Sequence, residues 1–417
     1  MSDPAEAARQ FNLAQAPASF VDDPYPTYAA LRLHAPVHEM APGQWLLTRH
    51  ADVEAIYRHP AASSDKQREF GPKFGVGTPL YEHHTTSLVF NDAPRHTRVR
   101  RLLMGALSQR AIARMEAGVV ALVDGLLDEL PGHEQPCLIE HFAARIPIEV
   151  IGNLLGIPRE ERGPLRGWSL AILSALEPAP AESILARGHA AVTEFTGYLR
   201  GLVRQRRAHP GDPEADVLTR LIQGQLLGHA AAPTADQTAD AGLSESELLH
   251  NCIFLLNAGH ETTTNVIGNG VHALMGQRDQ WQRLLAEPAL INPGVEELLR
   301  FESPLQLNNR QLTSDVQIGG YSLPAGSFIT LGIGAANHDP AVFADPGRLD
   351  LARKPNPHLA FGQGAHACSG MNVARLEARL ALGGLARRYP RLHLAGSATR
   401  DRRVRFRGFR ALPIGLD

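Results

Sequence analysis

The stretch FGQGAHACSG, residues 361–370, places a lone cysteine, Cys368, behind a loop that is punctuated by Gly362 and Gly364. Glycine adopts backbone angles that are closed to other residues, so several N–H groups of such a loop can converge on one sulfur. Apolar residues at helical spacing follow in residues 369–388, and a helix N-terminus also favours a thiolate over a thiol. The stretch therefore predicts a stabilised thiolate or, as the plainer alternative, a buried cysteine beside a glycine-rich turn.

The chemistry open to a single thiolate is limited. Closed zinc and iron–sulfur sites need three or four ligands, whereas one thiolate can be the axial ligand of a haem and donate electron density to its iron. The two other cysteines, Cys137 and Cys252, are far from Cys368 in the sequence, and the three form no C-x-x-C pair. A disulfide framework is therefore not expected, and a reducing cytoplasmic location fits this cysteine pattern.

Residues 361–370 closely resemble the haem-binding loop of the cytochrome P450 (haem-thiolate) monooxygenases, Phe-Gly-x-Gly-x-His-x-Cys-x-Gly, and every signature position is matched. The family's continuation Ala-Arg-Leu-Glu is also present, at residues 374–377. Ser369 is a small departure, because an apolar residue is commoner there. The resemblance implies the P450 fold, haem b as the cofactor with Cys368 as the axial ligand of the iron, and Phe361 as a further cofactor contact.

Length and charge set the bounds of the prediction. The 417 residues are 44% hydrophobic, which is enough to bury a large core, and we expect a single haem domain over residues 1–417. A formal net charge of −2 gives no pull toward nucleic acid or anionic membrane. No stretch approaches the roughly 18 apolar residues of a membrane span, and the polar N-terminus has no signal-peptide pattern. We therefore expect a soluble, cytoplasmic monomer with neither nucleic acid nor membrane as a partner.

The fold class is predicted as mainly α with small β-sheets (α+β). Apolar residues recur at helical spacing in four segments, residues 94–130, 141–156, 182–208 and 369–388. Short β-rich runs predict a hairpin at residues 37–40 and 44–48 and a small sheet between residues 311 and 331. Two further segments complete the pattern: a loop at residues 224–242 and, at residues 403–407, a strand whose alternating arginines form a solvated basic face.

The longest helical pattern begins with a capping box, in which Ser244 is the N-cap and Glu247 lies three residues later. The pattern continues to about Gly276, which corresponds to roughly 45 Å of helix. A helix of that length crosses a whole domain. The family resemblance implies that this is the long central helix over the haem.

The middle of that helix carries the stretch AGHETT, residues 258–263. A glycine inside a helix costs about 1 kcal/mol, so Gly259 needs a reason, and Thr262 can bond the carbonyl of Ala258 and bend the helix. Taken alone, the stretch fits a kinked, packed helix with a surface glutamate. It is similar to the family's Ala/Gly-Gly-x-Asp/Glu-Thr-Thr signature, which implies that Glu261 and Thr262 are the catalytic acid–alcohol pair for proton delivery, with Ala258 and Gly259 lining the oxygen pocket.

Two charged residues of a later helix, Glu297 and Arg300, lie three residues apart and therefore on one helix face. Alone this pair is a weak signal. It resembles the family's Glu-x-x-Arg, which implies a structural role below the haem and no part in the chemistry. At His338 the sequence departs from the arginine that is usual in the family, which puts one local salt bridge in doubt.

The two carboxylates of a buried haem need cationic partners, because unpaired buried charge is expensive. The resemblance implies four such partners, and the spacing of the first two places them on one helix face: His96, Arg100, Arg310 and His366. A metal site at His83 and His84 is disfavoured, because we expect these histidines in a loop without a partner motif.

The resemblance implies a monooxygenase reaction, in which substrate-H, O₂, two electrons and two protons give substrate-OH and water. Two alternatives remain open. A peroxide-dependent peroxygenase would share the cysteine loop but would more often lack the glutamate–threonine pair. A non-enzymatic haem sensor or carrier would need no proton delivery at all.

Electrons must come from other proteins, because the sequence contains no Gly-x-Gly-x-x-Gly fingerprint and no cysteine cluster for a flavin or iron–sulfur domain. We expect a ferredoxin and its ferredoxin reductase, which would dock near Cys368 on the arginines Arg98, Arg101, Arg375 and Arg379. The substrate is expected to be a largely apolar small molecule, because the predicted pocket walls include Leu305, Leu307, Asn308 and Phe406.

Overall fold

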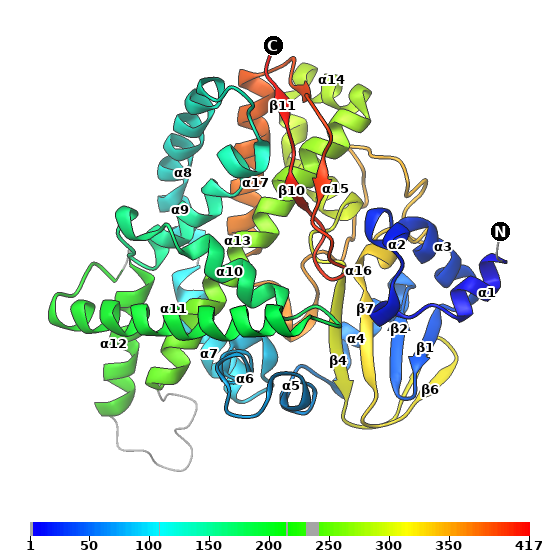
Figure 1. The fold of residues 1–417 in the computed structure, drawn as a ribbon, viewed down its shortest axis with the longest axis horizontal. Coiled ribbons are helices and arrows are strands. Elements are labelled where there is room, and N and C mark those ends of the chain that lie inside the picture. Colours follow the sequence, from blue (N-terminus) through cyan, green and yellow to red (C-terminus); the bar gives the residue numbers. More distant parts are fainter. Residues whose placement is uncertain (1–2, 108, 214–215, 231–241) are drawn as a thin grey trace.

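The computed structural model describes residues 3–107, 109–213, 216–230 and 242–417 (Figure 1). Along these residues the helices are α1 Pro4–Arg9, α2 Ala18–Asp22, α3 Tyr25–His34, α4 His50–Arg58, α5 Gln67–Phe74, α6 Pro79–Thr86, α7 Arg95–Ala106, α8 Gln109–Glu129, α9 Arg145–Leu154, α10 Leu165–Ser174, α11 Glu182–Ala208, α12 Val217–Ala230, α13 Glu245–Gly276, α14 Arg278–Ala286, α15 Ile291–Phe301, α16 Ile333–Ala336 and α17 Met371–Arg388. The strands are β1 Val37–Ala41, β2 Gln44–Leu47, β3 Ala62–Ser63, β4 Leu307–Leu312, β5 Val316–Ile318, β6 Tyr321–Leu323, β7 Phe328–Gly332, β8 His393–Leu394, β9 Thr399–Arg400, β10 Phe409–Ala411 and β11 Ile414–Gly415. The predicted mainly α fold with small sheets is confirmed.

The largest sheet has five strands in the order β1-β2-β7-β4-β3 and lies to one side of the helices, next to the N-terminal helices α1–α3 (Figure 1). Strands β2 and β7 run parallel, and the other neighbours are antiparallel. The sheet therefore joins the N-terminal region of the chain to strands that lie about 270 residues later in the sequence. Two-stranded pairs complete the β-structure of the described residues: β5 with β6, β8 with β11, and β9 with β10.

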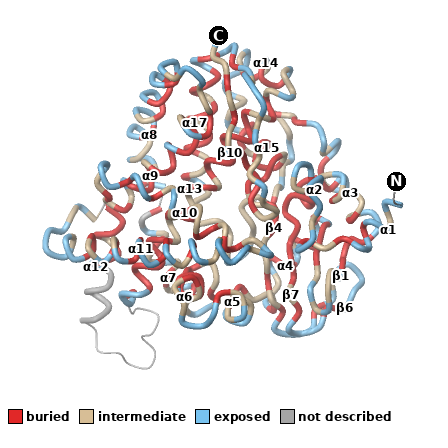
Figure 2. Tube along the Cα trace, viewed as in Figure 1, coloured by how far each residue is buried: buried red, intermediate tan, exposed pale blue. Residues whose placement is uncertain are grey.

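Helix α13 runs through the centre of the helical part, where it packs against α9, α10, α15 and α17 (Figure 1). The predicted capping box is present, because the Ser244 side chain accepts from the backbone N–H of Glu247 and the Glu247 side chain accepts from that of Ser244. Buried residues are concentrated along α13, α15 and α17, whereas α8 keeps one face exposed (Figure 2).

Several predicted elements are confirmed at nearly the same bounds. The hairpin is β1 and β2, the predicted helix at residues 182–208 is α11, and the helix after the cysteine loop is α17. The β-rich runs around residues 311–331 are β4 to β7, and the helix expected at 141–156 is the shorter α9. These segments have regular apolar spacing and clear turn residues at their ends, which is why the sequence locates them well.

The helical spacing at 94–130 is confirmed and corresponds to two helices, α7 and α8. Two other predictions about elements were wrong. Residues 224–230, predicted as the first part of a loop that ends at 242, belong to helix α12, which extends to Ala230; residues 231–241 lie outside the described residues. Residues 403–407 form no strand beyond a single bridge at Phe406, and their arginines are not solvated, because buried carboxylates and amides draw them inward.

Within the part of the chain that the structure describes, no helix is both long enough and apolar enough to cross a membrane. Even α13, the longest helix of this part, carries His, Asn and Glu side chains through its middle.

Candidate haem site

The cysteine loop adopts the backbone conformation that its glycines permit. Gly362 and Gly364 have φ angles of +61° and +71°, a region that L side chains rarely adopt. A Cβ atom on Gly364 would lie 2.6 Å from the carbonyl oxygen of Tyr57 at the end of α4, so glycine is also required by this close approach. The loop closes on itself where the N–H of Cys368 donates to the carbonyl of Phe361 at 2.9 Å.

Cys368 lies three residues before the first residue of α17, as the sequence predicts. Burial raises the pKa of its thiol, whereas the N–H of Gly370 and the guanidinium groups of Arg100 and Arg375 lower it by less. One backbone N–H therefore acts on the sulfur in place of the several that we expected. The loop by itself does not make a stable thiolate, but a bound metal cation would, because a coordinated thiol is deprotonated outright.

Basic side chains from three segments meet at this loop: α7, β4 and the loop itself. The rings of His96 and His366 are 4.0 Å apart, and Nη2 of Arg100 donates to the carbonyl of Ala367 at 2.8 Å. Arg310 reaches the same place from β4, and its positive charge contributes to lowering the pKa of both histidines. The structure thus brings together His96, Arg100, Arg310 and His366, which the sequence separates by up to 270 residues.

This cluster holds more basic than acidic side chains. Burial and the neighbouring cations lower the pKa of His96 and lower that of His366 to about 3, and burial lowers the pKa of Arg310. Asp92 opposes them at 3.9 Å from His366, but its carboxylate is 43% exposed and already accepts hydrogen bonds from residues 63 and 64. The buried Nε2 of His96 has no hydrogen-bond partner. A group that carries two carboxylates, as haem does, would fit this arrangement.

The centre of α13 is left uncovered on one side. Ala258 is exposed and Gly259 and Thr262 are half-buried, although the residues around them on this helix are buried. The predicted hydrogen bond is present, because Oγ1 of Thr262 donates to the carbonyl of Ala258 at 2.7 Å. The glycine at position 259 is required by packing against α9 and not by the bend at Thr262. A Cβ there would lie 2.6 Å from Cδ1 of Ile151, so glycine allows α9 to approach. The uncovered stretch of small side chains offers room for a flat apolar group.

Glu261 is buried beside Thr262, but its partner is one that the sequence did not reveal. One carboxylate oxygen forms an ion pair with Arg403, whose side chain is 9% exposed, and the other oxygen has no hydrogen-bond partner. The alternative interpretation of this stretch, a helix with a surface glutamate, is therefore excluded. The alternation of residues 403–407 concealed the pairing, because a solvated strand would place Arg403 in water.

Two further residues lie near the site, although the sequence analysis predicted no role for either. Tyr57 lies against the cationic cluster, with the guanidinium of Arg310 5.3 Å from its ring and the Nδ2 of Asn308 donating to its hydroxyl at 3.3 Å. Glu377 is buried in α17, where burial raises the pKa of its carboxyl to about 8 and the side chain of Thr263 hydrogen-bonds it. The first is an ordinary helix tyrosine in the sequence, and the second belongs to the matched motif at 374–377 but has no assigned role.

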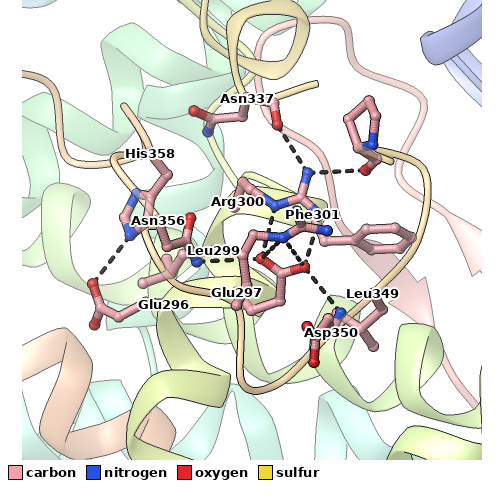
Figure 3. Close-up of polar contacts among 12 residues, drawn as sticks. Glu296, Glu297, Leu299, Arg300, Phe301, Asn337, Leu349, Asp350, Asn356 and His358 are labelled. Atoms are coloured by element: carbon pink, nitrogen blue, oxygen red, sulfur yellow. Dashed lines mark hydrogen bonds and ion pairs between the residues drawn. The ribbon is translucent and has the colours of Figure 1, made fainter. Parts of the chain in front are cut away.

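Glu297 and Arg300 form a bidentate ion pair in which both side chains are fully buried (Figure 3). Arg300 also donates to the carbonyls of Asn337, Pro346 and Arg348, so all five of its N–H groups are used. Glu297 accepts in addition from Arg353, Asn356 and the N–H of Asp350. This network fixes the irregular segment 337–356, which leads into the cysteine loop.

The departure at His338 is resolved locally. Its Nε2 donates to the carbonyl of Phe301 at 2.9 Å, and its ring stacks on Tyr25 at 4.1 Å. Burial lowers the pKa of His338 to about 4, so the residue packs as a neutral ring.

His83 and His84 lie in helix α6 and are buried, which corrects the prediction of a loop. Burial lowers the pKa of both side chains. Among the described residues no group of three or more His, Cys, Asp or Glu side chains is arranged to hold a metal ion.

Comparison with known proteins points to the family that the cysteine loop resembles. The family model for Cytochrome P450 matches residues 176–402. The chain is 32% identical over 417 residues to the biotin biosynthesis cytochrome P450 of Bacillus subtilis (strain 168), a match that covers 96% of this chain and 98% of that protein. It is 37% identical over 381 residues to the vitamin D(3) 25-hydroxylase of Pseudonocardia autotrophica, with 90% and 89% covered.

A solved structure supports the same assignment of the fold. The crystal structure of P450BioI in complex with hexadec-9Z-enoic acid ligated acyl carrier protein matches this chain with a TM-score of 0.87 and 31% sequence identity. The match covers 96% of this chain and 100% of that chain.

Proposed function

The chain belongs to the cytochrome P450 family, and from this premise we propose that Cys368 is the axial ligand of its haem and that Glu261 and Thr262 deliver protons to the reaction. Members of the family bind haem b through a cysteine thiolate, so haem b is the cofactor, and the chain is an oxidoreductase of the monooxygenase class. When bound, the haem supplies the activation of O₂ and the transfer of one oxygen atom to the substrate.

One observation above all supports the proposal: the cysteine loop, which carries Cys368 and His366, meets basic side chains of α7 and β4. In the proposed site the Cys368 sulfur binds the iron from the start of α17. His96, Arg100, Arg310 and His366 hold the haem carboxylates, and Phe361 supports the loop, since its carbonyl fixes the cysteine and the guanidinium of Arg375 lies 4.8 Å from its ring. Glu297 and Arg300 keep the structural role that their buried network supports.

Glu261 and Thr262 carry the proton part of the proposal. The unpartnered oxygen of Glu261 can take up a proton. The Thr262 hydroxyl donates its hydrogen to the carbonyl of Ala258, and the lone pairs of its oxygen can still accept a hydrogen bond. A proton that reaches Thr262 releases that hydrogen for onward donation. Ala258 and Gly259 line the O₂ pocket in this proposal: Ala258 adds little bulk there, whereas the missing Cβ of Gly259 makes room for Ile151 of α9.

The experiment that tests the proposal begins with Cys368→Ser. The reduced carbon monoxide complex should lose the red-shifted Soret band of thiolate ligation, whereas the control Cys137→Ser should keep it. In parallel, Thr262→Ala should bind haem and substrate but form less product for each NAD(P)H consumed. An unchanged Cys368→Ser spectrum would refute the ligand assignment, and unchanged coupling in Thr262→Ala would remove Thr262 from proton delivery.

The family implies redox partners, and we propose that they are a ferredoxin and its reductase. Of the arginines expected at the docking face, Arg98 does not lie there as an exposed contact, because its side chain is mostly buried and pairs with Glu247 at 2.5 Å. Arg375 and Arg379 remain partly exposed beside the cysteine loop, and each is paired with a glutamate. They line an open groove together with Gln109, Ile112, Ala113, Glu116, Asn292, Val295, Glu296, Asn372 and Leu376.

An acidic ferredoxin would have to displace the in-chain glutamates from these arginines, so its docking should weaken steeply as salt screens charges over about 10 Å at 0.1 M. Purified protein with NADPH and substrate alone should be inactive, and a ferredoxin system should activate it. Turnover by the isolated chain with NADPH would refute this electron supply.

We propose further that the substrate is a largely apolar small molecule. Leu305 and Phe406 pair across a β-bridge, whereas Asn308 is occupied by Tyr57. Leu307 does not belong to this wall, because it is buried in the cluster under the N-terminal helices. Screening a compound library for the shift of the haem spin state would identify binders, and a set of exclusively charged, polar binders would contradict the proposal.

A further inference from the structure

The carboxyl of Glu261 is held by a segment that is distant in the sequence. Arg403 comes from the irregular stretch between β9 and β10, and its guanidinium reaches both Glu261 on α13 and Asp401 at 2.6 Å. Both partners of the ion pair are nearly buried, with 9% and 2% of the two side chains exposed. The carboxylate of Glu261 compensates the charge of the buried guanidinium, since burial of an unpaired guanidinium is unfavourable.

The backbone that carries Arg403 is fixed from a third element. Oε2 of Glu177, in the connection between α10 and α11, accepts the N–H of Val404 at 3.0 Å and the N–H of Arg405 at 3.1 Å. The carbonyl of Glu177 accepts in turn from Nζ of Lys73 in α5 at 2.6 Å. The α10–α11 connection, the C-terminal stretch and α13 are thus linked by one chain of polar contacts.

We propose that Arg403 is a positioning residue for Glu261 in proton delivery, and that Glu177 places Arg403 by holding the backbone of Val404 and Arg405. The inference rests on the proposed function, in which Glu261 supplies protons. With one oxygen of Glu261 held by Arg403, the other buried oxygen is the one that takes up and passes on a proton. Passing a proton on returns Glu261 to the carboxylate, the next proton taken up from solvent restores the acid, and Arg403 is neither consumed nor altered.

The physical reason is that a proton donor works only within hydrogen-bond reach of its acceptor. A free glutamate side chain samples several rotamers, and ordering it has an entropic cost. The ion pair with Arg403 already holds Glu261 in one position before the reaction. The guanidinium also favours the ionised carboxylate, which is the form that accepts a proton. Displacement of the α10–α11 connection would release Val404 and Arg405, and Glu261 would then lose its fixed position.

Arg403 is tested with Arg403→Met, Arg403→Lys and the matched control Arg402→Met, whose arginine is 62% exposed on the same stretch. Arg403→Met should keep the carbon monoxide spectrum and the substrate-induced spin shift but lower product per NAD(P)H by about tenfold. Arg403→Lys should restore part of the coupling, and Arg402→Met should behave as the parent. In a Glu261→Gln background, Arg403→Met should have no further effect on coupling.

Glu177 is tested by a readout that needs no turnover. In Glu177→Leu the amides of Val404 and Arg405 should exchange hydrogen about fivefold faster, because each loses its acceptor, and coupling should fall with them. Glu177→Gln keeps an acceptor oxygen and should preserve both properties. Since Arg403 is intact in these variants, they decide the question even where Arg403→Met does not fold.

The outcomes separate the inference from the function beneath it. Lower coupling in Glu261→Gln together with unchanged coupling in Arg403→Met would refute the positioning role and leave the proposed proton delivery standing. Faster exchange in Glu177→Leu without loss of coupling would refute the role of Glu177. Unchanged coupling in Glu261→Gln would refute proton delivery by Glu261 itself, and the positioning role would fall with it.

Discussion

Two clusters of buried charge flank the cysteine loop, and they differ in how completely their members are paired. In the network of Glu297 and Arg300, the carboxylate is fully buried and every N–H of the arginine has an acceptor. In the cluster of His96, Arg310 and His366, burial and the neighbouring basic groups lower the pKa of both histidines, and the buried Nε2 of His96 has no hydrogen-bond partner. Removing one partner from a complete network leaves a buried charge uncompensated, whereas an incomplete cluster can still accept a negatively charged group.

The largest effect is expected where the complete network is broken. Glu297→Ala leaves the buried Arg300 without its carboxylate and should lower the free energy of unfolding by about 3–5 kcal/mol. The measurement is urea denaturation followed by circular dichroism. Glu287→Ala is the control, because this glutamate is 62% exposed and pairs with Arg283 at 3.8 Å. An equal decrease in the free energy of unfolding in the two variants would show that the buried network stabilises the fold no more than an exposed ion pair does.

The incomplete cluster should respond with the opposite sign in the apoprotein. Arg310→Met removes a buried cation that lacks a carboxylate partner, so the free energy of unfolding without haem should stay the same or rise by about 1 kcal/mol. Haem affinity should fall by at least tenfold, because one carboxylate of the haem loses its partner.

Both quantities are measured on one preparation, by denaturation of the apoprotein and by haem transfer to an acceptor protein. The exposed Arg387 provides the control variant Arg387→Met, which should change neither. A large loss of apoprotein stability in Arg310→Met would place Arg310 in the same class as Arg300 and remove the distinction between the clusters.

A buried acid can also avoid the penalty by staying neutral, as Glu377 does. Burial raises the pKa of its carboxyl from 4.5 to about 8. Between these pH values the folded chain keeps a proton that the unfolded chain releases, so stability falls as the pH rises. Glu377→Gln removes this dependence, and its advantage over the parent should grow by about 1.4 kcal/mol per pH unit from pH 5 to pH 8. Parallel stability curves for the two proteins would contradict this account.

The smallest effect concerns His84, which is buried between the rings of Phe70, Phe74 and Phe90. Burial lowers the pKa of His84 from 6.5 to about 3. Between these values the unfolded chain binds more protons, so stability falls as the pH falls. His84→Phe should reduce the acid-side slope of the unfolding free energy by at most about 1.4 kcal/mol per pH unit. The same change at the exposed His209 should leave the slope as in the parent; a similar reduction at both positions would refute the assignment.

Local patterns carried much of the fold. The capping box at Ser244 and the helix at 182–208 were predicted correctly, because capping and helical spacing are properties of neighbouring residues. The helical spacing at 94–130 did not locate the bounds of α7 and α8 within it, since the apolar spacing continues from one helix to the next. The strand at 403–407 was wrong for another reason: alternation predicts a solvated face only where no buried carboxylate draws the polar side chains inward.

The sequence by itself determined the conformation of the cysteine loop, with Gly362 and Gly364 at positive φ, and the hydrogen bond from Thr262 to Ala258, because these features depend on residues within a few positions of one another. Only the tertiary structure decided which charges meet. Arg403 pairs with Glu261 across 142 positions, and Arg98 is taken up by Glu247 across 149. The free energy of a buried charge depends on the partners and on the water that the whole fold places around it, and no local pattern records either.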